Sequence, residues 1–135
     1  RAKHPFNPML LAEFINKPWP GVVRSKGFFW LATRPQHVGE FSQAGALTRT
    51  SRRGRWWASV PQDRWPDNQE WRTAMQPYLD PEWGDRRQEL VFIGMDPMDE
   101  QAIRNALDGC LVTAQRFSPE AWTRLQDPFP SWQTA

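Results

Sequence analysis

The stretch Gly21-Val-Val-Arg-Ser-Lys-Gly-Phe-Phe-Trp-Leu-Ala32 decides how the rest of the chain is interpreted. Its apolar residues run without a break from Phe28 to Leu31, which is typical of a strand covered on both faces. A glycine inside such a strand, here Gly27, usually marks a bulge or a close approach of other backbone. We therefore predict that residues 21–32 form the central strand of a sheet. Lys26 is a candidate contact residue, although the simpler interpretation is a solvated lysine at a strand end.

Length and composition indicate one domain that is rich in rings. A chain of 135 residues can bury one core and is too short for two, so we expect residues 1–135 to form a single domain. It contains 9 Trp, 8 Phe and 13 Pro, and its mean hydropathy is −0.73. The apolar surface is thus concentrated in large rings, which bury much area each. Because the first residue is Arg, we expect a piece of a longer protein whose upstream domain is missing.

Charge and cysteine content narrow the class of protein. Residues 1–64 contain eleven Lys and Arg against three Asp and Glu, whereas residues 65–135 contain six against twelve. The two halves should attract each other, and strand pairing is a natural use of that asymmetry. A single cysteine, Cys110, excludes an internal disulfide and a thiolate-rich zinc site and fits a reducing, cytoplasmic compartment. No apolar run approaches the roughly 20 residues that span a bilayer, so we expect no membrane partner.

The remaining pattern predicts an α+β fold in which helices cover one face of a mostly antiparallel sheet. Its order of elements is that of a two-layer sandwich related to the ferredoxin-like fold. We expect the rings of the tail, residues 127–132, to dock on the body. The expected strands are 1–6 (a strand tail), 21–32, 37–43, 46–50, 54–60 and 88–94, with 46–50 and 54–60 joined as a hairpin by 51–54; the expected helices begin at Asn7-Pro8, at 68, at Asp96-Pro97 (running to 111) and at Ser118-Pro119.

Four sequence motifs carry a resemblance to a known family. They are Arg24-Ser-Lys-Gly-Phe-Phe-Trp-Leu-Ala32, Gly39-Glu-Phe-Ser-Gln-Ala-Gly45, Gly54-Arg-Trp-Trp-Ala58 and Trp83-Gly-Asp-Arg-Arg-Gln-Glu-Leu-Val-Phe-Ile-Gly94. Each motif alone is weak. In this order and at this separation, with the closing Asp127-Pro-Phe-Pro-Ser-Trp132, they resemble the C-terminal domain of the CobW-type GTPases. These are metal chaperones related to the cobalamin-synthesis protein CobW, and the Trp-rich motifs look most like the zinc-linked members.

The resemblance implies an accessory domain without catalysis of its own. In that family an N-terminal P-loop GTPase domain carries the nucleotide site and a Cys-x-Cys-Cys metal motif, and neither motif occurs in this sequence. GTP, Mg and zinc are therefore expected only with the N-terminal domain, and no cofactor with this fragment. The implied role is to couple the GTPase domain to metal-dependent client proteins in zinc homeostasis. Expected partners are the chain's own GTPase domain and those clients, and exposed rings could also allow homo-oligomers.

One motif departs from the family pattern. Before the first helix the family usually has Arg-Pro-Phe-His-Pro, whereas this chain has His4-Pro5-Phe6-Asn7-Pro8. Asparagine still suits the start of a helix but is a poor metal ligand. We therefore transfer no metal or contact role to Asn7 or to His4.

The residues themselves indicate no reactive or metal-binding centre. A zinc site would need His4, His37 and Cys110 to converge, and the sequence has no His-x-His or Cys-x-x-Cys pair. The paired carboxylates Asp85 and Glu89 lie beside arginines at 86 and 87, which favours ion pairs over acid–base chemistry. We predict no catalytic, cofactor-binding or metal-binding residue in this fragment.

Two hypotheses for binding remain open. The first is protein–protein interaction, with candidate contacts at Lys26, Trp30, Arg52, Arg53, Trp57, Trp83, Asp85 and Arg86. The second is a small single-stranded nucleic-acid binder, because arginines at 49, 52, 53 and 55 adjoin tryptophans at 56 and 57, a mixture that suits phosphates and stacked bases. Against both stands a simple hairpin with a solvated turn and tryptophans in the core. A steep loss of affinity with added salt would distinguish nucleic-acid binding.

Overall fold

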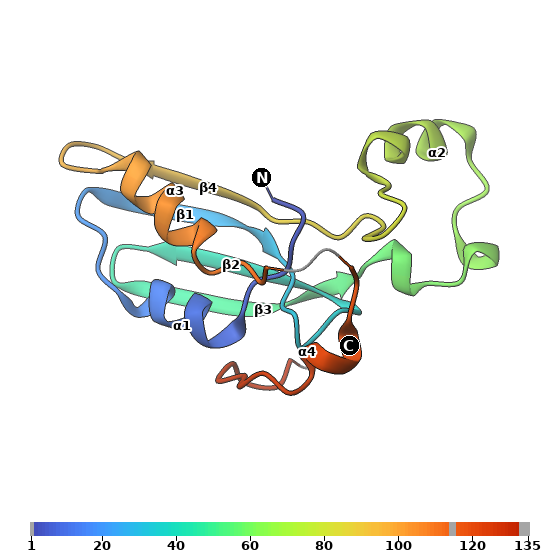
Figure 1. The fold of residues 1–135 in the computed structure, drawn as a ribbon. Coiled ribbons are helices and arrows are strands. Elements are labelled where there is room, and N and C mark those ends of the chain that lie inside the picture. The colour runs from blue at the N-terminus through green and yellow to red at the C-terminus, as the bar shows by residue number, and fades with distance from the viewer. Residues whose placement is uncertain (1, 114–115, 133–135) are drawn as a thin grey trace.

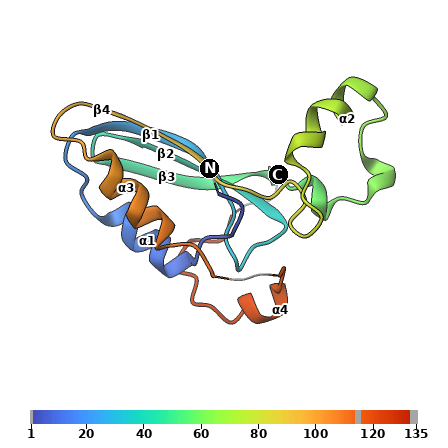
Figure 2. The ribbon, with the colours of Figure 1, turned by 45° about the horizontal axis from the view of Figure 1, so that its top comes forward.

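The computed structural model describes residues 2–113 and 116–132. Four antiparallel strands in the order β3-β2-β1-β4 form one layer, and helices α1 and α3 lie across one face of it (Figure 1, Figure 2). The predicted α+β class, with two layers, is confirmed. The elements are α1 (Pro8–Asn16), β1 (Val22–Phe29), β2 (His37–Ala44), β3 (Leu47–Arg55), η1 (Trp57–Ser59), η2 (Gln62–Arg64), α2 (Gln69–Met75), η3 (Gln76–Tyr78), β4 (Glu89–Gly94), α3 (Glu100–Asp108) and α4 (Pro119–Trp122).

Side-chain caps fix where the two covering helices begin. The side chain of Asn7 accepts hydrogen bonds from the backbone N–H groups of Met9 and Leu10 at 3.0 and 3.2 Å, as its position before Pro8 predicts. For α3 the predicted cap at Asp96-Pro97 is wrong. Asp99 caps the helix instead, accepting from the Ala102 N–H at 3.0 Å, so α3 starts later and ends at Asp108.

The predicted hairpin at 51–54 is also wrong. Residues 47–55 form one strand, β3, and the tight turn lies at Gly45, whose φ of +60° is a conformation that favours glycine. The pairing shifts between Val38 and Gly39, which face Gly54 and Arg52, so Arg53 is the extra residue of a bulge. After Arg55 the chain leaves the sheet in the 3₁₀ turn η1, where a strand over 54–60 was expected.

The central position of β1 is confirmed, but its predicted coverage on both faces is wrong for the first half of the strand. Ser25 and Phe29 are buried under the helices, whereas Arg24 and Lys26 are exposed on the other side of the sheet. Complete burial begins only where the apolar run leaves the sheet. Gly27 is a close approach as predicted, because a Cβ there would lie 2.1 Å from the carbonyl oxygen of Glu89.

Two hydrophobic clusters hold the fold together. The first lies between the sheet and helices α1 and α3; its buried members are Phe6, Leu11, Phe14, Phe29, Leu31, Phe41, Ile103 and Cys110. The second lies beyond the end of β1 and consists mainly of rings; its buried members are Trp30, Ala32, Trp56, Trp83 and Trp122. Because β1 runs from the first cluster into the second, it connects both.

The C-terminal tail docks on the body, as predicted. The rings of Phe129 and Trp132 lie 6.3 and 6.1 Å from that of Phe29. The guanidinium of Arg34 binds both carboxylate oxygens of Asp127, at 2.9 and 3.1 Å, and lies 4.3 Å from the Trp132 ring centroid. This bidentate pair joins segments that are far apart in the sequence.

Strands β3 and β4 are at opposite edges of the sheet and are joined by a long connection, residues 56–88. It contains η1, η2, α2 and η3 and projects away from the sheet (Figure 1). The helix predicted at 68–76 is confirmed as α2, with Asn68 accepting from the Trp71 N–H at 3.0 Å.

Candidate interaction surface

Two of the candidate interaction residues, Trp30 and Trp83, lie inside the second cluster. Trp30 is fully buried and Trp83 is 7% exposed. The indole N–H of Trp30 donates to the carbonyl of Lys3 at 2.9 Å, and the ring of Trp83 stacks on Trp122 at 5.9 Å. Stacked and edge-on ring pairs add stability beyond the buried area. Both tryptophans thus contact other residues of this chain.

The buried residue Gln88 connects the N-terminal segment to the end of β1 by hydrogen bonds, a role that the sequence analysis missed. Its side-chain oxygen accepts from the backbone N–H of Trp30 at 2.8 Å, and its amide nitrogen donates to the carbonyl of His4 at 2.6 Å. Its backbone N–H and carbonyl both bond to Ala2, at 2.7 and 3.3 Å. Buried Gln88 thus bonds to the N-terminal segment and to the end of β1, and it fixes their positions relative to its own segment.

Asp85 holds the two ends of the long connection together. Its carboxylate is 3% exposed and accepts from the backbone N–H groups of Trp57 at 3.0 Å and Ala58 at 2.9 Å. These donors lie in η1, 27 residues or more earlier in the chain. The carboxylate thus satisfies donors that the short 3₁₀ turn leaves free.

The Arg86 side chain is buried beside it. Its Nε donates to the carbonyl of Pro35 at 2.7 Å, and its guanidinium carbon lies 4.4 Å from the Phe117 ring centroid. Burial lowers the pKa of Arg86, and the nearby charge of Asp85 opposes that shift. The motif Trp83–Arg86 therefore positions the long connection and the second cluster, with both charged groups engaged by the chain itself.

Arg52 and Trp57 are half-buried and have internal partners. The Nε of Arg52 donates to the Nδ1 of His37 at 3.0 Å, and the ring of Trp57 meets that of Trp71 edge-on at 4.9 Å. Burial lowers the pKa of His37, and the charges of Arg52 and Arg55 lower it further. His37 is thus a neutral hydrogen-bond acceptor.

Lys26 and Arg53 lie on the side of the sheet away from α1 and α3. We call this side the open face, because no helix of the described residues crosses it (Figure 2). Cross-strand pairing places Lys26 between Ser42 and Val91, and the guanidinium of Arg53 lies 5.5 Å from the Phe28 ring. Its outward side chains are Arg24, Lys26, Phe28, Glu40, Ser42, Ala44, Leu47, Arg49, Ser51, Arg53, Glu89, Val91 and Ile93.

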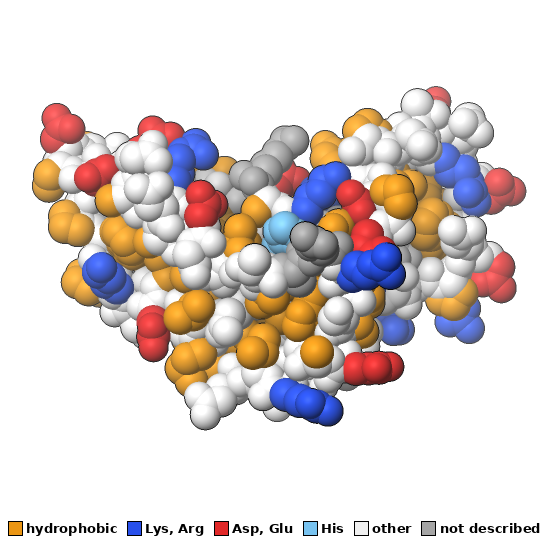
Figure 3. Space-filling view, viewed as in Figure 1, with side chains coloured by type: hydrophobic (Ala, Val, Ile, Leu, Met, Phe, Trp, Pro, Cys, Tyr) orange, Lys and Arg blue, Asp and Glu red, His pale blue; other side chains and the backbone are white. Residues whose placement is uncertain are grey.

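The open face combines positive charge with exposed aliphatic groups. Ser42 separates Lys26 from Arg49 across three strands, and Val91 and Ile93 beside them are 53% and 54% exposed. On the side that carries α1 and α3, by contrast, positive and negative side chains are interspersed around hydrophobic ones (Figure 3). Val91 and Ile93 lie opposite Lys26 and Arg24, whereas the two acidic residues of this face, Glu40 and Glu89, lie opposite Phe28. Exposed aliphatic residues beside positive charge are typical of an interaction surface.

Sequence analysis found only part of this surface. Arg24 was not named, and Arg49 was named only for nucleic-acid binding, although both are outward neighbours of Lys26 along and across the sheet. The usable signal was the spacing of Arg24 and Lys26 within Val22–Phe29, because side chains alternate along a strand and residues two apart share a face. The apolar run that follows Lys26 obscured that alternation.

The histidines and the cysteine lie apart. Among residues 2–113 and 116–132, no group of three or more His, Cys, Asp or Glu side chains is close enough to hold a metal ion. His4 contacts the Trp83 ring, and His37 binds Arg52. Burial raises the pKa of the Cys110 thiol to about 11, and that thiol lies 3.2 Å from the carbonyl oxygen of Ala106. In the same part of the chain no helix is long and apolar enough to cross a membrane.

Comparison with known proteins agrees with the motifs. The chain is 34% identical over 133 residues to the zinc-regulated GTPase metalloprotein activator 1 of Dictyostelium discoideum, a match that covers 95% of this chain and 28% of that protein. It is 32% identical over 136 residues to the zinc chaperone Rv0106 of Mycobacterium tuberculosis, covering 97% of this chain and 33% of that protein. The chain thus spans about a third or less of the length of these relatives. No solved structure matches it.

A family model matches most of the chain. The model described as the cobalamin synthesis protein cobW C-terminal domain matches residues 1–111, which include β1 to β4 and both covering helices. The resemblance inferred from the four motifs is thereby confirmed, and the chain belongs to the family of cobW C-terminal domains.

Proposed function

We propose that this chain is the non-catalytic interaction and regulatory domain of a GTP-binding zinc chaperone. It couples a GTPase domain in the same protein to metal-dependent clients, and GTP, Mg and zinc bind to that other domain. Residues 1–135 act as one accessory unit in the cytoplasm. The relatives named as a zinc-regulated GTPase metalloprotein activator and a zinc chaperone support the class of protein.

The open face carries the proposal. Arg24, Lys26, Arg49 and Arg53 provide positive charge on one side of the sheet, and Val91 and Ile93 provide apolar area beside it. A partner with an acidic rim around an aliphatic patch would complement this surface in both respects. We assign direct contact to Lys26 and Arg53 among the candidate residues.

The other candidates act through position. Trp30, Trp83, Asp85 and Arg86 are buried and fix the end of β1 and the base of the long connection. Arg52 and Trp57 fix the bulge of β3 and the start of η1. A change in these six residues would alter the open face by moving β1 or β3.

Nucleic-acid binding is the second candidate function, and the geometry favours it less. The hypothesis needs rings exposed beside the arginines of β3 so that bases can stack on them. Trp56 is buried, and Trp57 is engaged with Trp71. The arginines alone would give weak, salt-sensitive binding without stacking.

A charge-reversal experiment tests the proposal. The chain is titrated by calorimetry with the GTPase part of its own full-length protein, loaded with GDP or with a GTP analogue. The double variant Lys26→Glu, Arg49→Glu reverses two neighbouring charges on the open face, and we expect affinity to fall at least tenfold with the melting temperature unchanged. The matched control is Arg124→Glu, which makes the same type of change at an exposed site after α4.

Three results would count against the proposal. These are equal affinities for the double variant and the control, no binding of the wild-type chain with either nucleotide, or a gel shift of single-stranded oligonucleotides that the double variant abolishes.

A further inference from the structure

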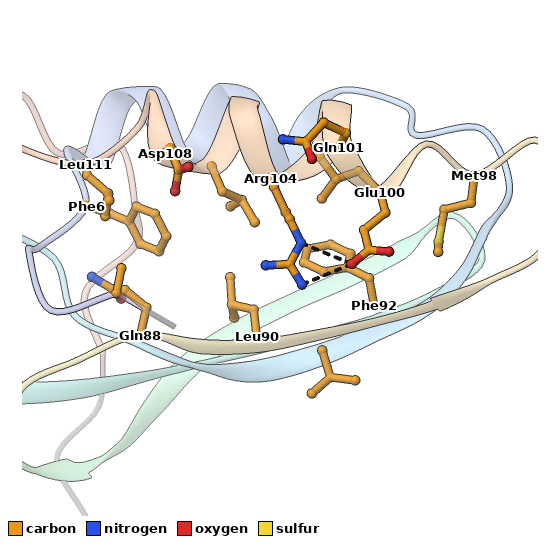
Figure 4. Close-up of a pocket in the computed structure, with 14 residues that line it drawn as sticks. Phe6, Gln88, Leu90, Phe92, Met98, Glu100, Gln101, Arg104, Asp108 and Leu111 are labelled. Atoms are coloured by element: carbon orange, nitrogen blue, oxygen red, sulfur yellow. Dashed lines mark hydrogen bonds and ion pairs between the residues drawn. The ribbon is translucent and has the colours of Figure 1, made fainter. Parts of the chain in front are cut away.

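The outer edge of β4 is flanked by a groove. The groove has a volume of about 580 Å³ and runs between β4 and α3. Figure 4 shows Leu90 and Phe92 on the strand side of the groove and Glu100 and Arg104 on the helix side. Glu100 and Arg104 form an ion pair with each other, with a shortest N–O distance of 3.0 Å. Its apolar lining also includes Phe6, Met98, Ile103 and Leu107.

The main-chain N–H and C=O groups of β4 point alternately toward its neighbour β1 and toward this outer edge. Main-chain groups of successive residues in an antiparallel strand point to opposite sides. The N–H of Met95, next after β4, bonds to the carbonyl of Gly21 on the β1 side at 3.0 Å, so odd-numbered residues face β1. Even-numbered residues therefore direct their N–H and C=O groups outward, at Gln88, Leu90 and Phe92.

The first of these outward residues already has a strand partner. Ala2 and Gln88 form an antiparallel bridge and exchange both main-chain hydrogen bonds. Ala2 is also part of the lining of the groove at that end. An antiparallel partner continued backward from Ala2 would run along β4 toward Gly94, opposite Leu90 and then Phe92.

We propose that the groove holds a fifth strand, formed by the residues that precede Arg1 in a longer chain. The register follows from the Ala2–Gln88 bridge: the residue directly before Arg1 lies opposite Leu90, and the third and fifth before it lie opposite Phe92 and Gly94. These three share the helix side of the sheet with Leu90 and Phe92, so they are apolar and fill the groove under α3. The residues between them lie on the open face.

This strand decides where the rest of the protein attaches. Five residues extend about 17 Å at ~3.4 Å each, so the strand starts near Gly94 and the turn into α3. The upstream part then enters beside Val91 and Ile93 of the open face. The inference rests on the proposed function only in that the chain is part of a longer protein, and its test needs no binding partner.

Amide hydrogen exchange tests the strand directly. In residues 1–135 alone, the N–H groups of Leu90 and Phe92 exchange rapidly, while that of Val91, which faces β1, is protected. In the chain extended by the residues encoded before Arg1, exchange at Leu90 and Phe92 slows at least a hundredfold. Val91 is the internal control, with protection in both.

A pair of proline variants in the extended chain separates pairing from general stabilisation. Proline at the third residue before Arg1 removes an N–H that bonds to Phe92, and we expect protection at Leu90 and Phe92 to be lost. Proline at the second residue before Arg1 removes an N–H that points away from β4, and protection is kept.

The inference is overturned by equal exchange in the two chain lengths or by a reading frame with no residues before Arg1. It is likewise overturned by polar residues at the first and third preceding positions, or by protection that appears only when another protein is added.

Discussion

Replacement of Asp85 by alanine tests whether the Trp83–Arg86 motif serves structure or contact. Its carboxylate accepts two backbone hydrogen bonds, at 2.9 and 3.0 Å, and is 3% exposed. A hydrogen bond to a charged group contributes about 1.5–3 kcal/mol net. Water can reach the N–H of exposed Ala58 after the substitution, so we expect the lower end, about 3 kcal/mol for the pair.

Two further variants serve as references for the stability loss expected in Asp85→Ala. Asp85→Asn keeps one acceptor oxygen and places an amide N–H beside the second donor, so we expect a loss of about 2 kcal/mol. Asp99→Ala removes an exposed carboxylate that caps α3 through one bond to Ala102, and such a cap is worth about 1 kcal/mol. Urea unfolding followed by tryptophan fluorescence measures all three.

The loss of unfolding free energy in Asp85→Ala decides between a structural role and a contact role for Asp85. If Asp85→Ala unfolds with a free energy within 0.5 kcal/mol of the wild type, roughly the noise of a surface change, the carboxylate does not hold η1 in place. If stability holds and affinity for the GTPase part falls, Asp85 is a direct contact. That result would refute the positional role assigned to it.

Other residues give independent checks. Burial and Arg52 lower the pKa of His37 below its ordinary 6.5, so the unfolded chain binds more protons than the folded chain as pH falls below about 6.5. The free energy of unfolding should therefore decrease in that range. In urea titrations from pH 7.5 to 5, His37→Gln should reduce this decrease. The Cys110 thiol, with its pKa raised to about 11, should react with a disulfide reagent at pH 8 only after denaturant is added, and rapid reaction of the native chain would contradict its burial. A double-mutant cycle on Arg34→Ala and Asp127→Ala should give a coupling energy of about 2 kcal/mol, whereas additive losses would show that the tail docks through its rings alone.

Local signals predicted the parts of the fold that depend on them. The Asn7 cap and the apolar spacing after it located α1, and the four apolar residues Leu90–Ile93 located β4. The family followed from motifs and their separation. These features are readable because capping and periodicity act within a few residues.

Tertiary contacts decided what the sequence could not show. The bond between Gln88 and Trp30 joins residues 58 positions apart, and no local pattern marks it. In β4 the side chains on the open face, Val91 and Ile93, are as apolar as those that face the helices. The sequence of β4 therefore gave no sign of which side of the strand is exposed. The hairpin was misplaced because Gly54 lies in a bulge, where a glycine resembles a turn residue.

The meeting of Trp57 and Ala58 with Asp85 also bears on protein engineering. The 3₁₀ turn and the Gly84 segment touch so closely that a Cβ at Gly84 would lie 2.3 Å from that of Ala58. The segment between them is a loop whose two ends are in contact, and doubling the length of such a loop costs only about 0.6 kcal/mol in closure entropy. Reporter sequences or new chain termini placed near η2 should therefore leave the sheet undisturbed.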